Sequence, residues 1–385
     1  PVPELPRFHG GGVGYLGYEA MHHYEDVPSP KVDTLGLPEA SFMFADTLLI
    51  FDHLKHKIKV VSHAHLAGQD LKTSYQEAVG RIGTLISRLQ TPLRQTSSSL
   101  SKPIKSAYKT TSNLTKKQHE SNVRTAQEYI YSGDVIQVVL SQRFSRKTDA
   151  HPFNIYRTLR TVNPSPYMFY LDFVDFQLVG ASPEVLVRSE EGNLDYHPIA
   201  GTRPRGKNEE EDQDLEKELL SDEKDRAEHL MLLDLGRNDI GRVSTPGTVK
   251  VTQLMDIERY SHVIHLVSHV KGNLRPEISP YDALWSCFPA GTVSGAPKLR
   301  AMEIISELEP DKRGPYAGSV GYFSFSGNMD TCITIRTMVF KEGIAHVQAG
   351  GGIVADSVPH LEYMETVHKA QALMKAIDEA ESRTW

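Results

Sequence analysis

The stretch Tyr167-Met168-Phe169-Tyr170-Leu171-Asp172-Phe173-Val174-Asp175-Phe176-Gln177-Leu178-Val179 contains two runs of aromatic and branched residues separated by two positions. Such runs predict β-strands at Tyr167–Phe173 and Phe176–Val179, and a third strand is predicted at Val185–Arg188. Further strands are predicted at residues 12–18, 42–51, 57–61, 135–144, 316–325, 330–340 and 344–348. Because the strands come in blocks and do not alternate strictly with helices, the sequence predicts an α+β fold.

Helices are predicted between these blocks, at residues 74–89, 116–132, 221–235, 280–288, 297–308 and 357–381. Ser221 and Ser279 are expected to be N-caps, because their side chains accept hydrogen bonds from the first free N–H groups of a helix. Gly133 and Gly236 are expected to end helices, since glycine readily takes the left-handed conformation. Thr91–Lys117 is rich in Ser, Thr and Lys, which predicts an exposed linker.

Composition excludes several classes of protein. The chain has 385 residues, a formal net charge of −7 and two cysteines, Cys287 and Cys332. Two isolated cysteines make neither a disulfide framework nor a zinc pattern. The acidic balance argues against a nucleic-acid binder, and no apolar run approaches the ~20 residues that span a bilayer. With no visible signal peptide, the sequence predicts a soluble, cytoplasmic protein.

Two glycine-rich segments partly match the motifs of nucleotide-binding loops. Gly12–Gly17 matches G-x-G-x-x-G, but it lies in a predicted strand after a Pro-rich segment, so a dinucleotide site is not expected. Its first residues echo Ser319–Phe323, which also predicts a strand. Gly291–Lys298 lacks the glycine spacing of a phosphate-binding loop. The helix expected to start near Pro297 still offers free N–H groups that suit a carboxylate.

Charged residues occur inside predicted helices and beside turns. Glu228 lies in an otherwise apolar helix, and with Lys224 four positions earlier the pattern alone indicates a solvated stripe. His262 and His265 are three positions apart, and such histidines are more commonly structural than catalytic. Arginines that could bind carboxylates lie at Gly201–Gly206, Arg237–Asp239 and Ile335–Thr337.

The last predicted helix carries acidic residues beside its apolar stripe. Glu362, Glu365 and Lys369 share one side of it. The helix follows Ala349–Gly352, which we interpret as a loop whose bare backbone closes on an anion. Glutamates from two helices, here joined by Glu228, are the hard oxygen ligands that magnesium takes.

Taken together, these segments resemble the chorismate-utilising enzymes, and most closely the large subunits of anthranilate synthase. The matching stretches are residues 10–24 more loosely, and 135–144, 180–184, 198–206, 226–242, 256–270, 288–305, 313–323, 330–337 and 347–366. The resemblance implies two large β-sheets packed together with helices on the outside. Residues 1–115 would form the N-terminal part of this β-sandwich body plus the exposed linker, truncated relative to the family, and residues 116–385 the chorismate-binding catalytic region.

The resemblance also implies roles for individual residues. Glu228 and Glu365 would bind Mg²⁺, with Glu362 beside the metal, and the ion would hold the ring carboxylate of chorismate. Glu184 would be the general acid for the leaving hydroxyl, and His265 would assist the proton removal that expels pyruvate. The remaining implied contacts are Arg336, Tyr316, Gly350, Gly351 and Gly352 at the enolpyruvyl carboxylate, and Thr292, Gly201 and Thr202 along the ring. A dianionic substrate needs a metal ion and an arginine to offset its charge.

Two positions distinguish branches of the family. Isochorismate and salicylate synthases carry a water-activating Lys where this chain has Gln137, and Gln cannot act as that base. Aminodeoxychorismate synthases typically carry a nucleophilic Lys where this chain has Ala200. Asn163-Pro164-Ser165-Pro166-Tyr167-Met168 is similar to one part of the family's tryptophan-feedback site. The resemblance implies that the other part would belong to an N-terminal segment outside this sequence.

The resemblance therefore implies an anthranilate synthase large subunit: a magnesium-dependent lyase of tryptophan biosynthesis that converts chorismate and ammonia to anthranilate and pyruvate. Neither cysteine lies in a glutaminase nucleophile motif, so ammonia is expected from a separate glutamine amidotransferase subunit, in a homo- or hetero-oligomer. The alternatives are an aminodeoxychorismate synthase with a non-covalent route, and a catalytically silent subunit that binds chorismate or tryptophan. A nicotinamide-dependent oxidoreductase based on Gly12–Gly17 is a distant third.

Overall fold

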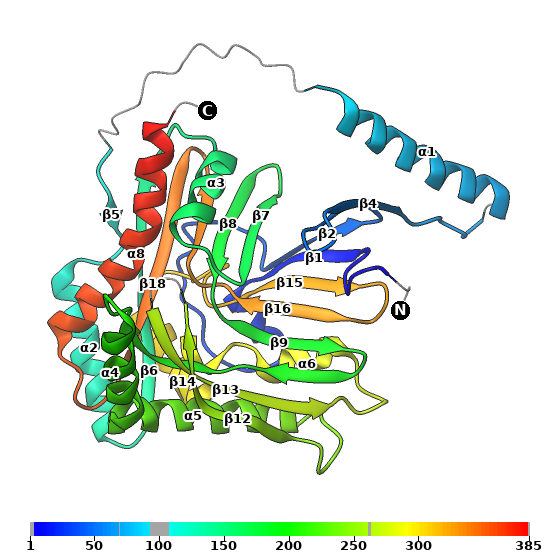
Figure 1. Cartoon of the computed structure of the whole chain (residues 1–385). Helices are drawn as coiled ribbons and strands as arrows, with labels where there is room; N and C mark the ends of the chain where they lie inside the picture. The colour runs from blue at the N-terminus through cyan, green and yellow to red at the C-terminus, as the bar shows by residue number, and fades with distance from the viewer. Residues whose placement is uncertain (1–3, 69, 93–107, 261–262, 384–385) are drawn as a thin grey trace.

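Two antiparallel β-sheets form the body of the protein (Figure 1). The computed structural model describes residues 4–68, 70–92, 108–260 and 263–383. The nine-stranded sheet has the order β11 (Ile199–Pro204), β13 (Val263–Asn273), β10 (Asn193–Tyr196), β9 (Val185–Glu190), β16 (Met329–Ile333), β15 (Ser319–Ser324), β1 (Gly11–Leu16) and β2 (Ala40–Ala45), with β12 (Lys250–Arg259) also on β13. The seven-stranded sheet has the order β14 (Gly295–Ala296), β6 (Gln137–Lys147), β18 (Ile344–Ile353), β17 (Thr337–Lys341), β8 (Phe176–Ser182) and β7 (Tyr167–Asp172), with β5 (Thr111–Ser112) also on β6.

The two sheets pack against each other through an apolar cluster. Tyr15 and Val320 of the nine-stranded sheet share this cluster with Leu178 and Val339 of the seven-stranded sheet, and all four are buried. Apolar surface removed from water stabilises the fold by about 25 cal/mol per Å², so this contact fixes how the sheets sit against each other. The predicted α+β fold with two packed sheets is confirmed.

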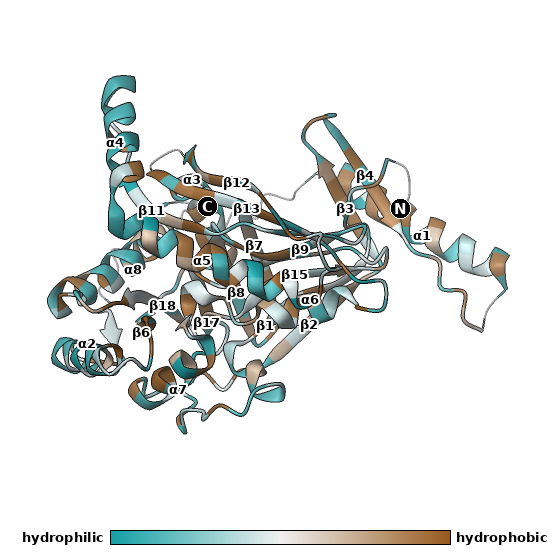
Figure 2. Cartoon of the chain, turned by 90° about the horizontal axis from the view of Figure 1, so that it is seen from below, coloured by the Kyte–Doolittle hydropathy of each residue, from teal (hydrophilic) through white to brown (hydrophobic). Residues whose placement is uncertain are grey.

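Helices cover the outer faces of both sheets (Figure 2). The seven-stranded sheet carries α2 (Lys116–Tyr131), α3 (Pro152–Val162), α7 (Lys298–Leu308) and α8 (Pro359–Ser382), and the nine-stranded sheet carries α4 (Glu209–Ser221), α5 (Glu223–Gly241) and α6 (Pro280–Cys287). Two short 3₁₀ helices are η1 (Tyr18–His23) and η2 (Gly291–Val293). The hairpin of β3 (Thr47–Asp52) and β4 (Lys57–Ser62) packs with α1 (Leu71–Gln90), which extends away from the body (Figure 1).

Several predicted helix ends are confirmed. Ser279 caps α6, because its hydroxyl accepts a hydrogen bond from the N–H of Asp282 while the Asp282 carboxylate accepts one from the Ser279 N–H. Gly133 follows α2 with a φ of +82°, the left-handed conformation expected of it. Pro359 opens α8, where its missing N–H removes no helical hydrogen bond.

The helix expected at residues 221–235 has different ends. Asp222, not Ser221, is its N-cap, since the Asp222 carboxylate accepts hydrogen bonds from two N–H groups of the first turn. The helix also continues beyond Gly236. That glycine is needed for packing, because a Cβ there would lie 2.0 Å from the Tyr196 ring. A close contact across the fold explains this glycine better than a helix end.

The strand expected at residues 330–340 is two strands in different sheets. β16 belongs to the nine-stranded sheet and β17 to the seven-stranded sheet. The chain changes sheet between them, and Arg336 at the crossing has a φ of +51°. The run expected at residues 42–51 is likewise divided, into β2 and β3, and β3 pairs with β4 as predicted.

The main elements that were not predicted are α3, α4, β10, β11, β12 and β13. α4 illustrates why, because its first turn consists of Glu209, Glu210, Glu211 and Asp212. Four consecutive acidic residues do not show the apolar periodicity that marks a helix in a sequence. Carboxylates at the N-terminus of a helix are favoured by the helix dipole, so the same residues support a helix.

The glycine pattern at residues 12–17 belongs to a strand, as predicted. β1 pairs with β15, so that Gly14 faces Gly321 across the ladder. A Cβ at Gly14 would lie 2.0 Å from the Ser41 carbonyl oxygen, which requires glycine there. The two echoing segments are therefore neighbouring strands.

Most of the predicted linker lies outside the described residues, at 93–107. Cys287 and Cys332 are both buried and free. Among the helices that the structure describes, none is long and apolar enough to cross a membrane.

Candidate active site

A cavity of about 240 Å³ is lined by residues of both sheets and of α5 and α8. It brings together residues that lie far apart in the sequence. The predicted site residues in its lining are Gln137, Glu184, Glu228, Thr292, Tyr316, Arg336, Gly350, Gly352 and Glu365. The predicted residues Gly201, Thr202, His265, Gly351 and Glu362 are not part of the lining.

Glu228 is held from across the cavity by an amide. Gln137 Nε2 donates a hydrogen bond of 3.0 Å to Glu228 Oε1, which joins β6 to α5. Lys224, the partner suggested by the helical spacing, lies instead 3.5 Å from a carboxylate oxygen of Asp356. Glu228 is therefore a cavity residue, and the solvated stripe inferred from the helix pattern alone is wrong.

Two carboxylates of α8 approach the same point of β18. A Cβ at Gly351 would lie 3.3 Å from Glu362 Oε2 and 3.6 Å from Glu365 Oε1. Burial raises the pKa of Glu362, and the nearby charge of Glu365 raises it further. Lys369 Nζ lies 2.6 Å from Glu365 Oε1 and donates a hydrogen bond of 2.9 Å to the Gly350 carbonyl oxygen. One ammonium group therefore offsets a local excess of negative charge.

This donor set fits a magnesium ion. Glu228 and Glu365 line one cavity from two different helices. Magnesium is usually held by one or two carboxylates and keeps its other positions for water and substrate oxygens. The three glutamates do not form a group whose oxygens all lie within 4.8 Å of one another. The arrangement thus suits an open site and not a closed protein cage.

Arg336 supplies an unpaired cation to the cavity. Its guanidinium forms no hydrogen bond or ion pair with any residue in the described parts of the chain. Burial lowers its pKa, and Tyr316 and Glu365 act in the opposite direction. A guanidinium without a carboxylate partner can bind an anionic ligand through two parallel hydrogen bonds.

Tyr316 stands beside the glycine run of β18. Burial raises its pKa to about 12, so the hydroxyl keeps its proton at neutral pH. A Cβ at Gly350 would lie 2.7 Å from this hydroxyl. Glycine at that position therefore leaves room for a hydroxyl that lines the cavity and can donate a hydrogen bond to a ligand.

The glycines of Ala349–Gly352 lie in a strand, which corrects the interpretation of this segment as a loop. β18 pairs with β6 through Gly350, Gly351 and Gly352. β17 pairs only with Ile344–Val347, so the other edge of the glycine segment has no strand partner in the described sheet. Backbone groups on that edge remain available to a ligand, and the absence of side chains gives access to them.

Glu184 is a buried carboxyl group in the cavity wall. Burial raises its pKa to about 8, against smaller opposing effects of Thr292 and Lys369. It is therefore mostly protonated at neutral pH and able to donate a proton. Thr292 Oγ1 is itself buried without a well-placed hydrogen-bond partner among the described residues. This is expected of a hydroxyl group that forms its hydrogen bond with a bound ligand.

His265 lies outside the lining and contacts Gly201 and Thr202, which follow the lining residue Ala200 in the chain. Its Nδ1 is 3.0 Å from the Gly201 carbonyl oxygen and 3.1 Å from Thr202 Oγ1. Burial lowers its pKa, partly offset by the Gly201 contact. A neutral ring whose Nδ1–H donates to Gly201 keeps a lone pair on Nε2, which is the atom that can accept a proton.

A buried ion pair lies beside Tyr316, a residue of the cavity lining. Arg313 NH2 lies 2.6 Å from Glu309 Oε1, and both side chains are almost fully buried. Ser141 of β6 donates to the same carboxylate through N–H and hydroxyl. The Arg313 guanidinium also lies over the Tyr316 ring, 5.6 Å from its centroid. The position of Tyr316 thus depends on this pair.

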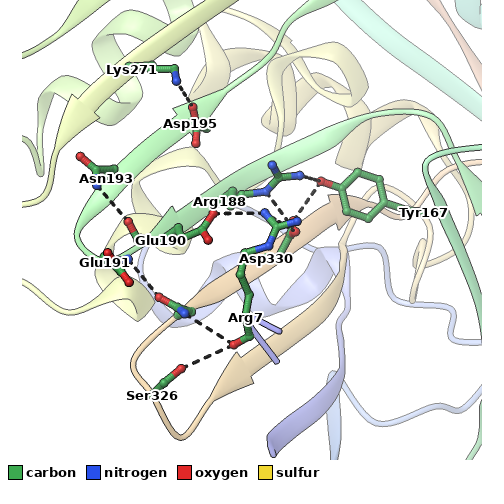
Figure 3. Close-up of polar contacts among 11 residues, drawn as sticks. Arg7, Tyr167, Arg188, Glu190, Glu191, Asn193, Asp195, Lys271, Ser326 and Asp330 are labelled. Atoms are coloured by element: carbon green, nitrogen blue, oxygen red, sulfur yellow. Dashed lines mark hydrogen bonds and ion pairs between the residues drawn. The ribbon is translucent and has the colours of Figure 1, made fainter. Parts of the chain in front are cut away.

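The segment Asn163–Met168 lies away from this cavity. Its Pro166, Tyr167 and Met168 line a separate cavity of about 410 Å³. Figure 3 shows the Tyr167 hydroxyl donating to Asp330 Oδ1 over 2.9 Å and accepting from Arg188 over 3.1 Å. The tryptophan-site role of this segment stays a prediction.

Sequence reasoning gave no site role to two polar residues of the lining, Gln348 and Lys369. Lys369 had been noticed on the same helix side as Glu365, and the four-residue spacing was a usable signal for their ion pair. Gln348 precedes the glycine run in β18, and its Oε1 is buried without a partner. Gln348 reaches the cavity because it lies on the inward face of β18. The sequence did not show the register that places it there.

Comparison with known proteins agrees with this site. The family described as chorismate binding enzyme matches residues 3–375. Anthranilate synthase component 1 of Acetivibrio thermocellus is 56% identical over 98% of this chain and 77% of its own length. That of Aquifex aeolicus is 53% identical over 98% of this chain and 76% of its own length. The crystal structure of anthranilate synthase component I from Streptococcus pneumoniae has a TM-score of 0.88 at 43% identity, covering 97% of this chain and 82% of that one.

The chain therefore belongs to the chorismate binding enzymes. Within them it groups with proteins named anthranilate synthase component 1, as the sequence motifs predicted. Both the fold and the family relationship inferred from the motifs are confirmed.

Proposed function

We propose that this chain is the catalytic large subunit of an anthranilate synthase, converting chorismate and ammonia to anthranilate, pyruvate and water in tryptophan biosynthesis. Its family and relatives support this. The observation that carries the proposal is the chemistry of one cavity. A carboxyl group that is protonated at neutral pH, Glu184, shares it with an unpaired guanidinium, Arg336, and with two carboxylates, Glu228 and Glu365.

Arg336 and Tyr316 are the proposed anchors of the enolpyruvyl carboxylate. The unpaired guanidinium and the protonated hydroxyl would each donate to it, together with free backbone groups of Gly350–Gly352. These donors are present before the substrate arrives, so little reorganisation accompanies binding.

Glu184 is the proposed general acid of the first stage. As nitrogen bonds to the ring, the bond from the ring to its hydroxyl oxygen breaks. The proton of Glu184 goes to that oxygen, which leaves as water. In the second stage a ring proton is removed, the bond from the ring to the enolpyruvyl oxygen breaks, and the enolpyruvyl methylene carbon takes up a proton, so that pyruvate is released. The neutral ring of His265, tied to Gly201, is the proposed group that assists this proton removal.

Gln137 and Ala200 support nitrogen as the incoming atom. The Gln137 amide oxygen is buried and has no partner among the described residues, so it can accept a hydrogen bond from ammonia. It has no basic group with which to activate water. Ala200 also lines the cavity, where its methyl group cannot act as a nucleophile.

Magnesium is the proposed cofactor, held by Glu228 and Glu365 with Glu362 nearby. When bound, it would neutralise the ring carboxylate and help to fix the substrate. A glutamine amidotransferase is the proposed partner that supplies ammonia, and an ammonium salt is expected to replace it in solution.

The deciding experiment incubates the purified chain with chorismate and an ammonium salt, with Mg²⁺ or with EDTA. Fluorescent anthranilate and an equal amount of pyruvate are expected with Mg²⁺, and neither with EDTA. A non-aromatic amine without pyruvate would indicate an aminodeoxychorismate synthase instead. Chorismate binding without any pyruvate at high ammonium would indicate a silent subunit.

A further inference from the structure

Three polar side chains outside the cavity converge at one end of the nine-stranded sheet. His197 lies in the turn between β10 and β11, Glu258 lies in β12 and His269 lies in β13. One ligand atom from each lies within 4.8 Å of the others, and no other set of three His, Cys, Asp or Glu residues in the described chain does so. The group joins three segments that are already fixed by strand pairing.

His197 carries a ring nitrogen that the protein does not satisfy. Its Nε2 is buried and has no hydrogen-bond partner in the part of the chain that the structure describes. The nearest acidic atom, Glu258 Oε1, is 3.7 Å away, which is too far for a hydrogen bond. The ring packs against that of His269, with centroids 3.9 Å apart. Buried polar atoms are normally paired, so an unpaired buried nitrogen indicates a binding position for a ligand.

Both the ring and its surroundings favour a neutral imidazole. Burial lowers the pKa of His197, and His269 and Arg188 lower it further against the effects of Glu258 and Asp195. Neutral imidazole is the form that binds metal ions.

Glu258 is oriented by a second residue. The Tyr260 hydroxyl donates a hydrogen bond of 2.7 Å to Glu258 Oε2, which leaves Oε1 on the side of His197. Metal-ligating carboxylates typically have such a partner, because it fixes the direction of the free oxygen.

We propose that His197, Glu258 and His269 bind a transition-metal ion of the Zn²⁺ type, at a site separate from the magnesium ligands. Two imidazole nitrogens and one carboxylate oxygen suit Zn²⁺ or Co²⁺, whereas Mg²⁺ prefers oxygen ligands. Tetrahedral Zn²⁺ holds its ligand atoms ~3.3 Å apart, given bonds of about 2.0–2.1 Å. The three candidate ligand atoms already lie within 4.8 Å of one another.

The surroundings leave room for the ion and a water molecule. His197 and His269 line a cavity of about 140 Å³ together with Arg188 and Asp195. The Arg188 charge is already paired with Asp330 at 3.0 Å, as Figure 3 shows. Asp195 Oδ1 lies 3.5 Å from Lys271 Nζ, and Figure 3 also draws this pair. The Asp195 carboxylate adds negative charge near the site. Glu258 is 38% exposed at its side chain, so the ion can enter from solvent.

Calorimetric titration of the EDTA-treated, dialysed full chain with Zn²⁺, in saturating Mg²⁺, tests this site. One Zn²⁺ per chain is expected for the wild type. Removing a ligand should weaken this binding at least about tenfold in both His269→Gln and Glu258→Gln. His53→Gln, at an exposed turn residue, is the matched control and should bind as the wild type does. Glu365→Gln should also retain the Zn²⁺ equivalent.

Co²⁺ gives a second readout that a loss of fold does not imitate. Its visible absorption bands should indicate four-coordination in the wild type and disappear in Glu258→Gln, while circular dichroism shows both proteins equally folded. Equal Zn²⁺ affinity in the wild type, His269→Gln and Glu258→Gln would overturn the proposal. So would loss of the Zn²⁺ equivalent in Glu365→Gln, because the ion would then occupy the magnesium ligands.

Discussion

Gln137 and Glu228 are 91 positions apart, yet the amide of one donates to the carboxylate of the other over 3.0 Å across the cavity. The bond connects a strand of the seven-stranded sheet to a helix on the nine-stranded sheet. In the proposed reaction it also connects the group that receives ammonia to a group that holds the metal. The same amide therefore contributes to two parts of the chemistry.

Gln137→Ala should raise the KM for ammonium about tenfold, because the loss of one hydrogen bond to a charged or polar partner is worth about 1–2 kcal/mol. Mg²⁺ affinity should also fall, since Glu228 loses its donor. Steady-state kinetics with varied ammonium and varied Mg²⁺ measure both effects. Gln177→Ala, which removes an exposed amide on β8, should change neither. An unaltered KM for ammonium in Gln137→Ala would remove this residue from the nitrogen site.

Glu184→Gln should lower kcat by about 10²–10⁴, the usual contribution of a general acid. The direction in which the wild-type kcat changes with pH can also be predicted. Because the pKa of Glu184 is raised to about 8, the proton donor is present below that pH and is lost above it. The wild-type kcat should therefore fall as pH rises through about 8. A pH–rate profile compares the two proteins, and an identical alkaline limb in Glu184→Gln would assign the pKa to another group.

Glu365→Gln should abolish magnesium-dependent turnover while leaving the fold near that of the wild type. Its side chain is 47% exposed, so the substitution removes a ligand without opening the core. Activity across a Mg²⁺ titration and a thermal melt measure the two properties separately. Glu379→Gln lies on the same helix and removes only surface pairs, with Lys375 and Arg383. If the two variants behaved alike, Glu365 would not be a metal ligand.

Glu309→Ala should destabilise the protein by about 3–5 kcal/mol, the usual result of leaving one member of a buried ion pair uncompensated. Here the remaining charge would be that of Arg313, whose side chain is 1% exposed. Urea unfolding measures the change. Asp214→Ala breaks the exposed pair with Lys217 and should cost less than about 1 kcal/mol. A similar cost in both variants would contradict the supporting role of the buried pair.

Local signals predicted the elements whose ends are encoded nearby. α6 and α8 followed from Ser279 and Pro359, because a cap or a missing N–H acts within one turn. Gly350–Gly352 was misread, since a glycine run is compatible with both a loop and a strand. Its strand conformation depends on pairing with β6, some two hundred positions away. Arg336 was expected inside a single strand because no local residue marks a change of sheet.

The cavity residues were predicted through the family resemblance and not through spacing. Glu184, for instance, has no local feature that reveals its burial, and burial is what raises its pKa. The cluster of His197, Glu258 and His269 was missed for a related reason. Its members meet only because β12 and the turn after β10 both lie against β13, and β10 and β12 were not predicted.

The crossing at Arg336 has a mechanical consequence. The strand before it belongs to one sheet and the strand after it to the other. A ligand bound by this guanidinium is therefore connected to both sheets at the point where the chain passes between them. Sliding one layer along the other would strain that grip. Occupancy by an anion should consequently make the whole body stiffer, and slow its cleavage by proteases that require the layers to part.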